Sequence, residues 1–167
     1  KPCRAAMWQQ WRCGQLAGAE LLSVGGPGQR SDLLVKVRAL FEKARDLAVI
    51  PDSATVHFEG SLAEGFGNQG SDVDFLVLVP GADAEAVMPT VLFIDGYRVE
   101  VRVQSHDQIR KRLSRIRAAV DAGSLGGVTE DVLNRVQRFL GGIVLRTGVR
   151  YDELRDIVSD SELQGVL

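Results

Sequence analysis

Two aspartates separated by one residue, Asp72 and Asp74, begin an apolar run that reads DVDFLVLV. If this run is a strand, both carboxylates lie on one face, roughly 6 to 7 Å apart, because successive side chains point to opposite faces. Two carboxylates at the mouth of a buried strand repel each other and lose hydration unless a cation neutralises them. Mg²⁺ binds carboxylates together with phosphate oxygens, so the pair predicts a metal site for phosphoryl chemistry. The alternative, acids that cap a turn, explains only one of the two.

A third carboxylate stands in the segment YRVEVRV, residues 97–103. The valines of this segment share one strand face, whereas Arg98, Glu100 and Arg102 share the other. If the segment pairs beside the strand of Asp72, Glu100 completes a cluster of three carboxylates. If it lies at the sheet edge instead, Glu100 is an exposed acid paired with a neighbouring arginine.

A glycine-rich segment lies directly before the two aspartates, with glycines at Gly60, Gly65, Gly67 and Gly70. Glycine lets backbone amides approach a ligand closely, and Ser61 can present its amide and hydroxyl to a phosphate. The simpler alternatives are a flexible loop and a serine that caps a short helix. The functional interpretation is a phosphate cradle followed by metal ligands, which hold opposite ends of one metal–triphosphate.

Taken together, these elements resemble the signature of the polymerase-beta-like nucleotidyltransferase superfamily, and are similar to its minimal and template-independent members. The pattern Gly-Ser-x-x-x-Gly followed by Ser-Asp-x-Asp is matched by Gly60, Ser61, Gly65, Ser71, Asp72 and Asp74. The resemblance extends over roughly residues 32–103. As departures, Glu64 stands where many minimal members carry arginine, and Glu59 adds an acid just before the first glycine.

The resemblance implies an enzyme that transfers a nucleoside monophosphate from a nucleoside triphosphate to an acceptor hydroxyl and releases pyrophosphate. It implies two Mg²⁺ ions, or Mn²⁺ in their place, held by Asp72 and Asp74. Glu100 would join the ion on the nucleophile side and help to activate the acceptor, and the Gly-Ser pair would contact the β- and γ-phosphates. The implied site is therefore Asp72, Asp74 and Glu100 for metal binding and catalysis, with Gly60, Ser61, Gly65 and Ser71 for cofactor binding.

Apolar spacing and turn signals predict the elements that position these residues. Helical periodicity over 31–48 follows Ser31 as N-cap, and Asp95-Gly96 between two alternating runs predicts a hairpin. Ser105 with Gln108 predicts a capping box at the start of a later helix. We expect helices at 5–22, 31–48, 105–123, 129–140 and 151–159, and strands at 54–59, 72–79, 91–94 and 97–103.

The order of these elements predicts an α/β (α+β) fold, in which a small mixed β-sheet nucleotidyltransferase core is flanked by helices. We expect an N-terminal helical segment with a Gly-rich linker (1–30), a catalytic core (31–104) and a helical C-terminal appendage (105–167). The linker is predicted from the run Gly25-Gly26-Pro27-Gly28.

Composition limits the classes of protein that the chain can belong to. Its 167 residues carry a net charge of −2 and its pI is about 5.7, whereas general polyanion binders are usually basic. No apolar run reaches the roughly 18 residues of a membrane span, and the N-terminus lacks the basic-then-apolar pattern of a signal peptide. Cys3 and Cys13, without a second pair, favour free thiols over a metal site or a disulfide. We therefore expect a cytoplasmic protein with no membrane partner.

The expected donor is a nucleoside triphosphate, and three acceptors stay open: a small molecule such as an aminoglycoside, a protein side chain, or an RNA 3′ end. The acidic pI disfavours RNA. One alternative function is a catalytically silent nucleotide-binding or interaction domain of the same fold, which the three intact acids disfavour. Another is a nucleic-acid-binding module that uses a basic helix, although a solvated face is the usual reading of such a helix. Its basic residues are Arg110, Lys111, Arg112, Arg115 and Arg117.

Overall fold

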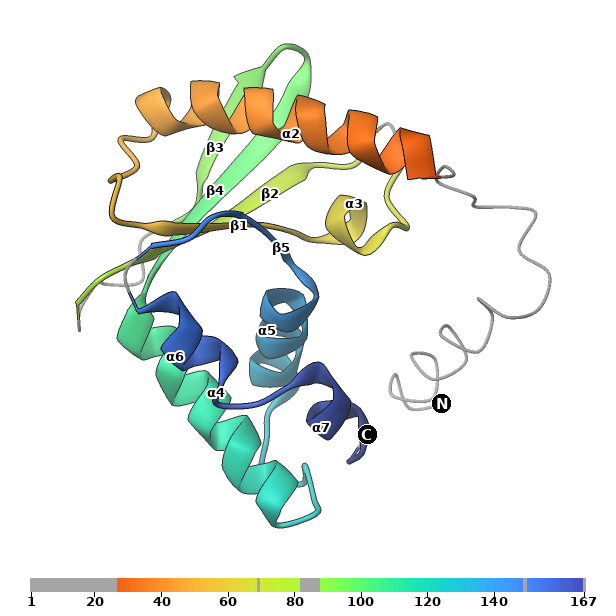
Figure 1. The fold of residues 1–167 in the computed structure, drawn as a ribbon, viewed down its shortest axis with the longest axis vertical. Coiled ribbons are helices and arrows are strands. Elements are labelled where there is room, and N and C mark those ends of the chain that lie inside the picture. The colour runs from red at the N-terminus through yellow and green to blue at the C-terminus, as the bar shows by residue number, and fades with distance from the viewer. Residues whose placement is uncertain (1–26, 69, 82–87, 149, 167) are drawn as a thin grey trace, which may run out of the picture.

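The computed structural model describes residues 27–68, 70–81, 88–148 and 150–166 (Figure 1). The predicted helix at 5–22 and both cysteines lie outside these residues. The described helices and strands are α2 (Pro27–Leu47), β1 (Thr55–Glu59), α3 (Ser61–Glu64), β2 (Val73–Val79), β3 (Thr90–Ile94), β4 (Tyr97–Ser105), α4 (His106–Asp121), α5 (Glu130–Gly141), β5 (Ile143–Arg146), α6 (Tyr151–Arg155) and α7 (Asp160–Gln164).

The strands form one five-stranded mixed sheet in the order β3-β4-β2-β1-β5. The central strand β2 runs parallel to β4 and antiparallel to β1, and the edge strands β3 and β5 pair antiparallel with β4 and β1. Figure 1 shows α2 across one face of the sheet and α4 to α7 on the other side. The predicted α/β (α+β) fold with a small mixed sheet flanked by helices is therefore confirmed.

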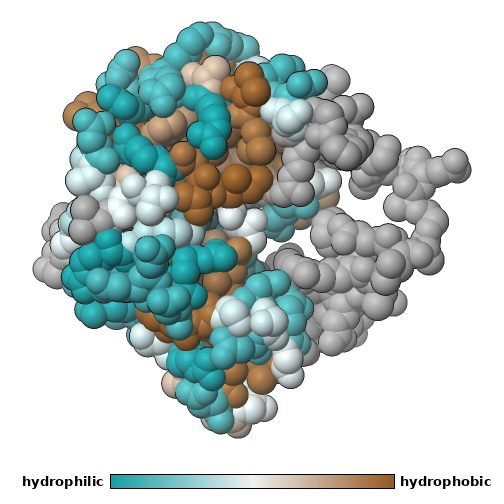
Figure 2. Space-filling model, in the orientation of Figure 1, coloured by the Kyte–Doolittle hydropathy of each residue, from teal (hydrophilic) through white to brown (hydrophobic). Residues whose placement is uncertain are grey.

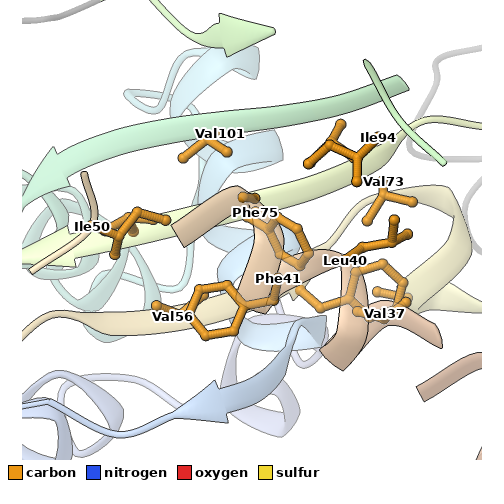
Figure 3. Close-up of a cluster of buried hydrophobic side chains, with 14 of the residues drawn as sticks. Val37, Leu40, Phe41, Ile50, Val56, Val73, Phe75, Ile94 and Val101 are labelled. Atoms are coloured by element: carbon orange, nitrogen blue, oxygen red, sulfur yellow. The ribbon is translucent and has the colours of Figure 1, made fainter. Parts of the chain in front are cut away.

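Both faces of β2 are buried, which explains why its sequence is almost continuously apolar. Phe75 and Val77 point toward α2, where Phe75 meets Phe41 edge to face with ring centroids 5.7 Å apart (Figure 3). Leu76 and Leu78 point the other way and pack with the helices that follow the sheet. The sheet thus separates two hydrophobic clusters.

Local signals fix several helix ends as predicted. The Ser105 side chain accepts a hydrogen bond from the Gln108 amide in a capping box, and Thr129 caps α5. Asp95 and Gly96 both have positive φ, 52° and 82°, as the predicted tight hairpin requires. Gly123, with φ of 64°, follows the end of α4.

Three features differ from the expectation. Helix α2 begins at Pro27 rather than after a cap at Ser31, because proline has a preset φ and is well tolerated in the first helical turn. The expected helix at 151–159 ends at Arg155 (α6), and a separate helix that was not predicted, α7, begins at Asp160 after the Ser159 capping box. Strand β5 was not predicted: its four residues are too few to show a period, and pairing with β1 makes it a strand.

The surface of the described chain is mostly polar on the face seen in Figure 2, with hydrophobic residues exposed mainly in a central band. Within residues 27–166, apart from the positions left undescribed, no helix combines the length and apolarity that crossing a bilayer requires.

His57 lies in the layer between the sheet and α5 and is fully buried. Its ring stacks on Phe139, with centroids 4.8 Å apart, and meets Tyr151 edge to face at 5.2 Å. Neither ring nitrogen has a hydrogen-bond partner among the described residues. Burial, assisted by the nearby positive charge of Arg155, lowers the pKa of His57 to about 4. His57 is therefore a packed core histidine.

We expect His57 to make the protein less stable in mild acid. In the unfolded state His57 takes up a proton near pH 6.5, and in the native state only near pH 4. The contribution of His57 to stability is therefore complete above pH 6.5 and is lost as the pH falls toward 4. Between about pH 7 and about pH 5 this amounts to roughly 2 kcal/mol of unfolding free energy. Urea denaturation at both pH values should show a correspondingly smaller loss for His57→Leu than for the wild type.

The control is His106→Gln, which leaves His57 in place, so the part of the pH dependence that His57 contributes should remain. His106 is the second histidine of the chain, and its Nε2 contacts the Arg150 carbonyl oxygen at 2.8 Å. Equal pH dependence in the wild type and His57→Leu would show that the imidazole does not titrate in this way.

Candidate functional site

Strand register brings three carboxylates into one row across the sheet. Asp74 is opposite Glu100 on the parallel neighbour β4 and opposite Glu59 on the antiparallel neighbour β1. Directly opposed residues point to the same face, so the three side chains lie side by side. Asp72, two positions before Asp74, belongs to the same face by alternation. The structure therefore brings Asp72, Asp74 and Glu100 together, as the pairing of their strands required.

This row lies on the face of the sheet that also carries α4 to α7. Those helices pack on the later residues of β2 and leave three of the acids partly exposed. The side chains of Asp72, Glu100 and Asp74 are 38%, 27% and 20% exposed. Glu59 is only 2% exposed. The face thus presents three carboxylates that solvent or a ligand can reach, with a fourth behind them.

Arginines neutralise the outer acids. Arg98 on β4 forms an ion pair with Asp72, and its Nη2 lies 3.7 Å from Glu100 Oε2. Because Arg98 and Glu100 are two apart on β4, the arginine reaches along its own strand face. The sequence analysis considered this pairing of Glu100 for a strand at the sheet edge; the structure places β4 inside the sheet beside β2, with Glu100 in the row and also near Arg98.

Two further arginines neutralise the inner acids. Arg102 on β4 forms an ion pair with buried Glu59. Arg138 on α5 places Nη2 at 2.8 Å from Asp74 Oδ2 and 3.8 Å from Glu59 Oε1. A buried carboxylate without such partners would be costly, so the fold needs these two arginines to keep Glu59 on this face.

Asp74 is the electrostatic centre of the row. Burial raises the pKa of its carboxyl above the ordinary value, and the negative charges of Glu100 and Glu59 raise it further. Arg138, and to a lesser extent Arg102, oppose this rise in the pKa. A divalent cation at Asp74 would act in the same direction as the arginines, because it favours the ionised carboxylate.

The Gly60–Ser61 turn passes directly over Asp74. Gly60 has φ of 82°, and a Cβ there would collide with Asp74 Oδ2 and lie 3.0 Å from Arg138 Nη2. Ser61 begins α3, and its carbonyl oxygen accepts hydrogen bonds from the amides of Phe66 and Gly67 at 3.0 and 2.9 Å. The predicted phosphate turn and the predicted metal ligands are therefore adjacent in space.

The remaining motif residues shape the loop. Gly65 ends α3 in the left-handed conformation, with φ of 86°. The Ser71 hydroxyl accepts a hydrogen bond from the Asn68 amide at 2.9 Å, and the Ser71 amide donates to the Asn68 carbonyl at 3.0 Å. These contacts close the turn before β2, and a part for either residue in binding a cofactor stays a prediction.

The acids are not gathered around a common point for a metal. In the portions of the chain described, no group of three or more His, Cys, Asp or Glu side chains is arranged to hold a metal ion. Arg98 and Arg138 draw Asp72 and Asp74 toward themselves instead. The donors are nevertheless all carboxylate oxygens on one accessible face, which is the chemistry that Mg²⁺ and Mn²⁺ prefer. The donor set fits such an ion once the guanidinium groups move.

Sequence reasoning missed Arg138 entirely and did not place Glu59. Arg138 is 64 residues from Asp74, and no local pattern links them. Glu59 was noted only as an acid before Gly60, although strand alternation from Glu59 and its antiparallel pairing with β2 could have placed it beside Asp74.

The predicted basic helix is α4, and several of its cations are engaged within the chain. Arg112 donates to Gln104 at 2.6 Å, and Arg110 lies 2.9 Å from Asp107. Arg117 forms ion pairs with Asp121 of the same helix and with Glu162 of α7, the second at 2.6 Å. These contacts favour a structural function for much of the helix over a free polyanion-binding face.

A sequence model described as a nucleotidyltransferase domain matches residues 37–135 of the chain. This stretch runs from within α2 to within α5 and contains every residue of the predicted site, but stops before Arg138. Among curated proteins, no sequence matches the chain.

Gly60 and Gly65 both have φ above 80° and differ in what a side chain would meet. Gly65 is in the αL region, where alanine costs about 1 kcal/mol of backbone strain, whereas Gly60, with ψ of −168°, is in a region that is essentially restricted to glycine, so alanine costs more there before any contact is counted. At Gly65 the new methyl group meets open space, whereas at Gly60 it collides with Asp74. We expect Gly60→Ala to lower the unfolding free energy by roughly 1 to 3 kcal/mol more than Gly65→Ala in urea denaturation. Equal losses for the two variants would contradict the contact between the turn and Asp74.

Proposed function

Because the chain belongs to the nucleotidyltransferase domain family, we propose that it transfers a nucleoside monophosphate from a nucleoside triphosphate to an acceptor hydroxyl. The family makes the protein a transferase of phosphorus-containing groups. The observation that carries the finer proposal is the pairing of Asp74 with Glu100 across β2 and β4, next to the turn at Gly60. A carboxylate row beside a glycine turn suits a triphosphate whose charge is neutralised by divalent cations.

In the proposed reaction the acceptor oxygen attacks the α-phosphorus and forms the new P–O bond. The bond from the α-phosphorus to the bridging oxygen of the β-phosphate breaks, pyrophosphate leaves with that electron pair, and the hydroxyl proton is lost to water. Two Mg²⁺ ions, or Mn²⁺, would supply charge neutralisation and lower the pKa of the acceptor hydroxyl.

The chain's own residues would divide the work by position. Asp72 and Asp74 would hold the metal ions. Glu100 would act on the acceptor side, because it lies on β4, between Asp74 on β2 and the edge strand β3. Gly60 and Ser61 would bind the β- and γ-phosphates. In this proposal the region 31–104 carries the catalytic acids and the region 105–167 supplies a helical layer. Catalysis would then consist of positioning and electrostatic stabilisation.

The ion pairs at the acids also suit a second candidate, a catalytically silent nucleotide-binding domain. In that case Arg98 and Arg138 would keep the acids permanently neutralised. The two candidates differ in turnover: the enzyme releases pyrophosphate with an acceptor of the right class, and the silent domain binds nucleotide without release. The acceptor classes to supply are small-molecule hydroxyls, protein side chains and RNA 3′ ends.

We expect Asp74→Asn to abolish Mg²⁺-dependent nucleotide binding and pyrophosphate release. The amide keeps the size of the side chain but removes the charge that a divalent cation needs, so the affinity should fall by about 100-fold or more. Calorimetric titration of ATP, GTP, CTP and UTP, with and without Mg²⁺, measures the loss and identifies the preferred base.

The matched control is Asp52→Asn, which removes a carboxylate that is 84% exposed and remote from the row. Its nucleotide affinity should equal that of the wild type. Circular dichroism and melting temperature establish that both variants fold. Full retention of Mg²⁺-dependent binding by folded Asp74→Asn would sink the assignment of the site.

A further inference from the structure

Arg138 reaches the acids from α5, outside the residues that match the family, and contacts the central carboxylate of the row. We propose that Arg138 is a positioning residue that competes with the divalent cation for Asp74, and that Glu59 is the partner that retains it when the cation binds. This inference rests on the proposed function, because it concerns the loading of the same site. It makes metal binding and triphosphate binding cooperative.

The geometry allows such an exchange without moving the helix. One atom, Arg138 Nη2, lies 2.8 Å from Asp74 Oδ2 and 3.8 Å from Glu59 Oε1. A shift of about 1 Å would change its closer partner, and a long side chain makes such a shift by small rotations about its bonds. In the part of the chain that the structure describes, Arg138 Nε is buried and has no hydrogen-bond partner. The guanidinium is therefore directed by the two carboxylates.

Glu59 is suited to retain the arginine because the Glu59 side chain is fixed in place by burial and by an ion pair. Its side chain is 2% exposed, and Arg102 pairs with it from β4. Removing positive charge from beside a buried carboxylate is costly, so Glu59 offers Arg138 an alternative partner when Asp74 is occupied. Asp74 is more exposed, at 20%, and is the one of the two that a metal ion can reach.

Charge balance then links the cation to the triphosphate. Arg102 and Arg138 offset the charges of the two inner acids, Glu59 and Asp74, and Glu100 adds a further negative charge beside Asp74. A divalent cation at Asp74 adds positive charge beside Arg138, which opposes binding of the metal alone. Arg138 Nη2 also lies 3.0 Å from the Cβ position of Gly60, at the turn proposed for the phosphates. Phosphate oxygens there would take up the excess positive charge.

The test uses the full chain and Mn²⁺ alone as probe, titrated without nucleotide and followed by electron paramagnetic resonance of the free ion. Arg138→Met keeps the length of the side chain and removes its charge, so the affinity for Mn²⁺ should rise about ten-fold. Arg150→Met is the matched control, because Arg150 is an exposed arginine that pairs with Glu153. Its affinity for Mn²⁺ should stay within about two-fold of the wild type.

Glu59→Gln should have the opposite effect. Without its second acid, Arg138 stays on Asp74 and the affinity for Mn²⁺ falls, by about ten-fold. Part of this fall would arise from the lost negative charge alone, so the double variant with Arg138→Met separates the two causes. If Glu59 acts through Arg138, its substitution should change the affinity much less in that background. A fall of equal size in both backgrounds would overturn the part of the proposal that concerns Glu59.

Inorganic tripolyphosphate supplies the second readout. In the wild type it should raise the affinity for Mn²⁺ at the site strongly, and in Arg138→Met the part of this enhancement that depends on Arg138 should be lost, so that the enhancement is about ten-fold smaller. Arg138→Lys, which keeps the charge but not the planar fork, should restore part of it. A purely structural function of Arg138 would change neither the Mn²⁺ affinity nor the enhancement in a folded variant.

The outcomes distinguish this inference from the proposed function. If the wild type binds Mn²⁺ and tripolyphosphate together, and folded Arg138→Met behaves as Arg150→Met does, the inference is wrong and the proposed function stands. If the wild type binds neither Mn²⁺ nor tripolyphosphate with Mn²⁺, both are overturned. If Glu59→Gln does not fold, Arg138→Met decides the question alone.

Discussion

The alignment of β1, β2 and β4 is the constraint on which the rest of the structure depends. It sets Glu59, Asp74 and Glu100 side by side, and like charges so close together oppose folding. Ion pairs with the arginines of β4 and α5 offset that repulsion, and packing of both faces of β2 stabilises the register. A register slip by one residue would turn the acids into the α2 layer and the phenylalanine of β2 out of it.

The acids of the site can be paired with either of two sets of positive charge. Without a ligand, guanidinium groups neutralise the acids, and the protein folds around them. With a bound metal–triphosphate, the proposed reaction requires cations at Asp72 and Asp74, and the arginines must find other partners. Buried Glu59, and the phosphates proposed to bind at the Gly60 turn, would be such partners. The arrangement is therefore suited to exchange one set of positive charges for another without unfolding.

The helical layer takes part in the site as well as covering the sheet. Residues 37–135 match the nucleotidyltransferase domain, yet Arg138, three positions further, contacts the central acid. Strand β5, which follows α5, pairs with β1 and extends the sheet at the edge opposite the hairpin. The proposed division at residue 104 therefore separates segments that share one sheet and one network of charges. His57, buried under α5, belongs to the same contact layer.

The sequence by itself determined the features that depend on neighbours within a few residues: the strand periods, the hairpin at Asp95-Gly96, the capping box at Ser105 and the Gly-Ser signature before Asp72 and Asp74. Alternation also grouped Glu100 with Arg98 and Arg102 on one face of its strand, and the pairing of β4 with β2 then set that face beside the aspartates. Tertiary structure decided which charges meet. Docking of α5 brings Arg138 to Asp74 across 64 residues, and pairing with β1 makes a strand of four residues that show no period. Such contacts depend on packing between segments distant in sequence, and no local sequence pattern predicts them.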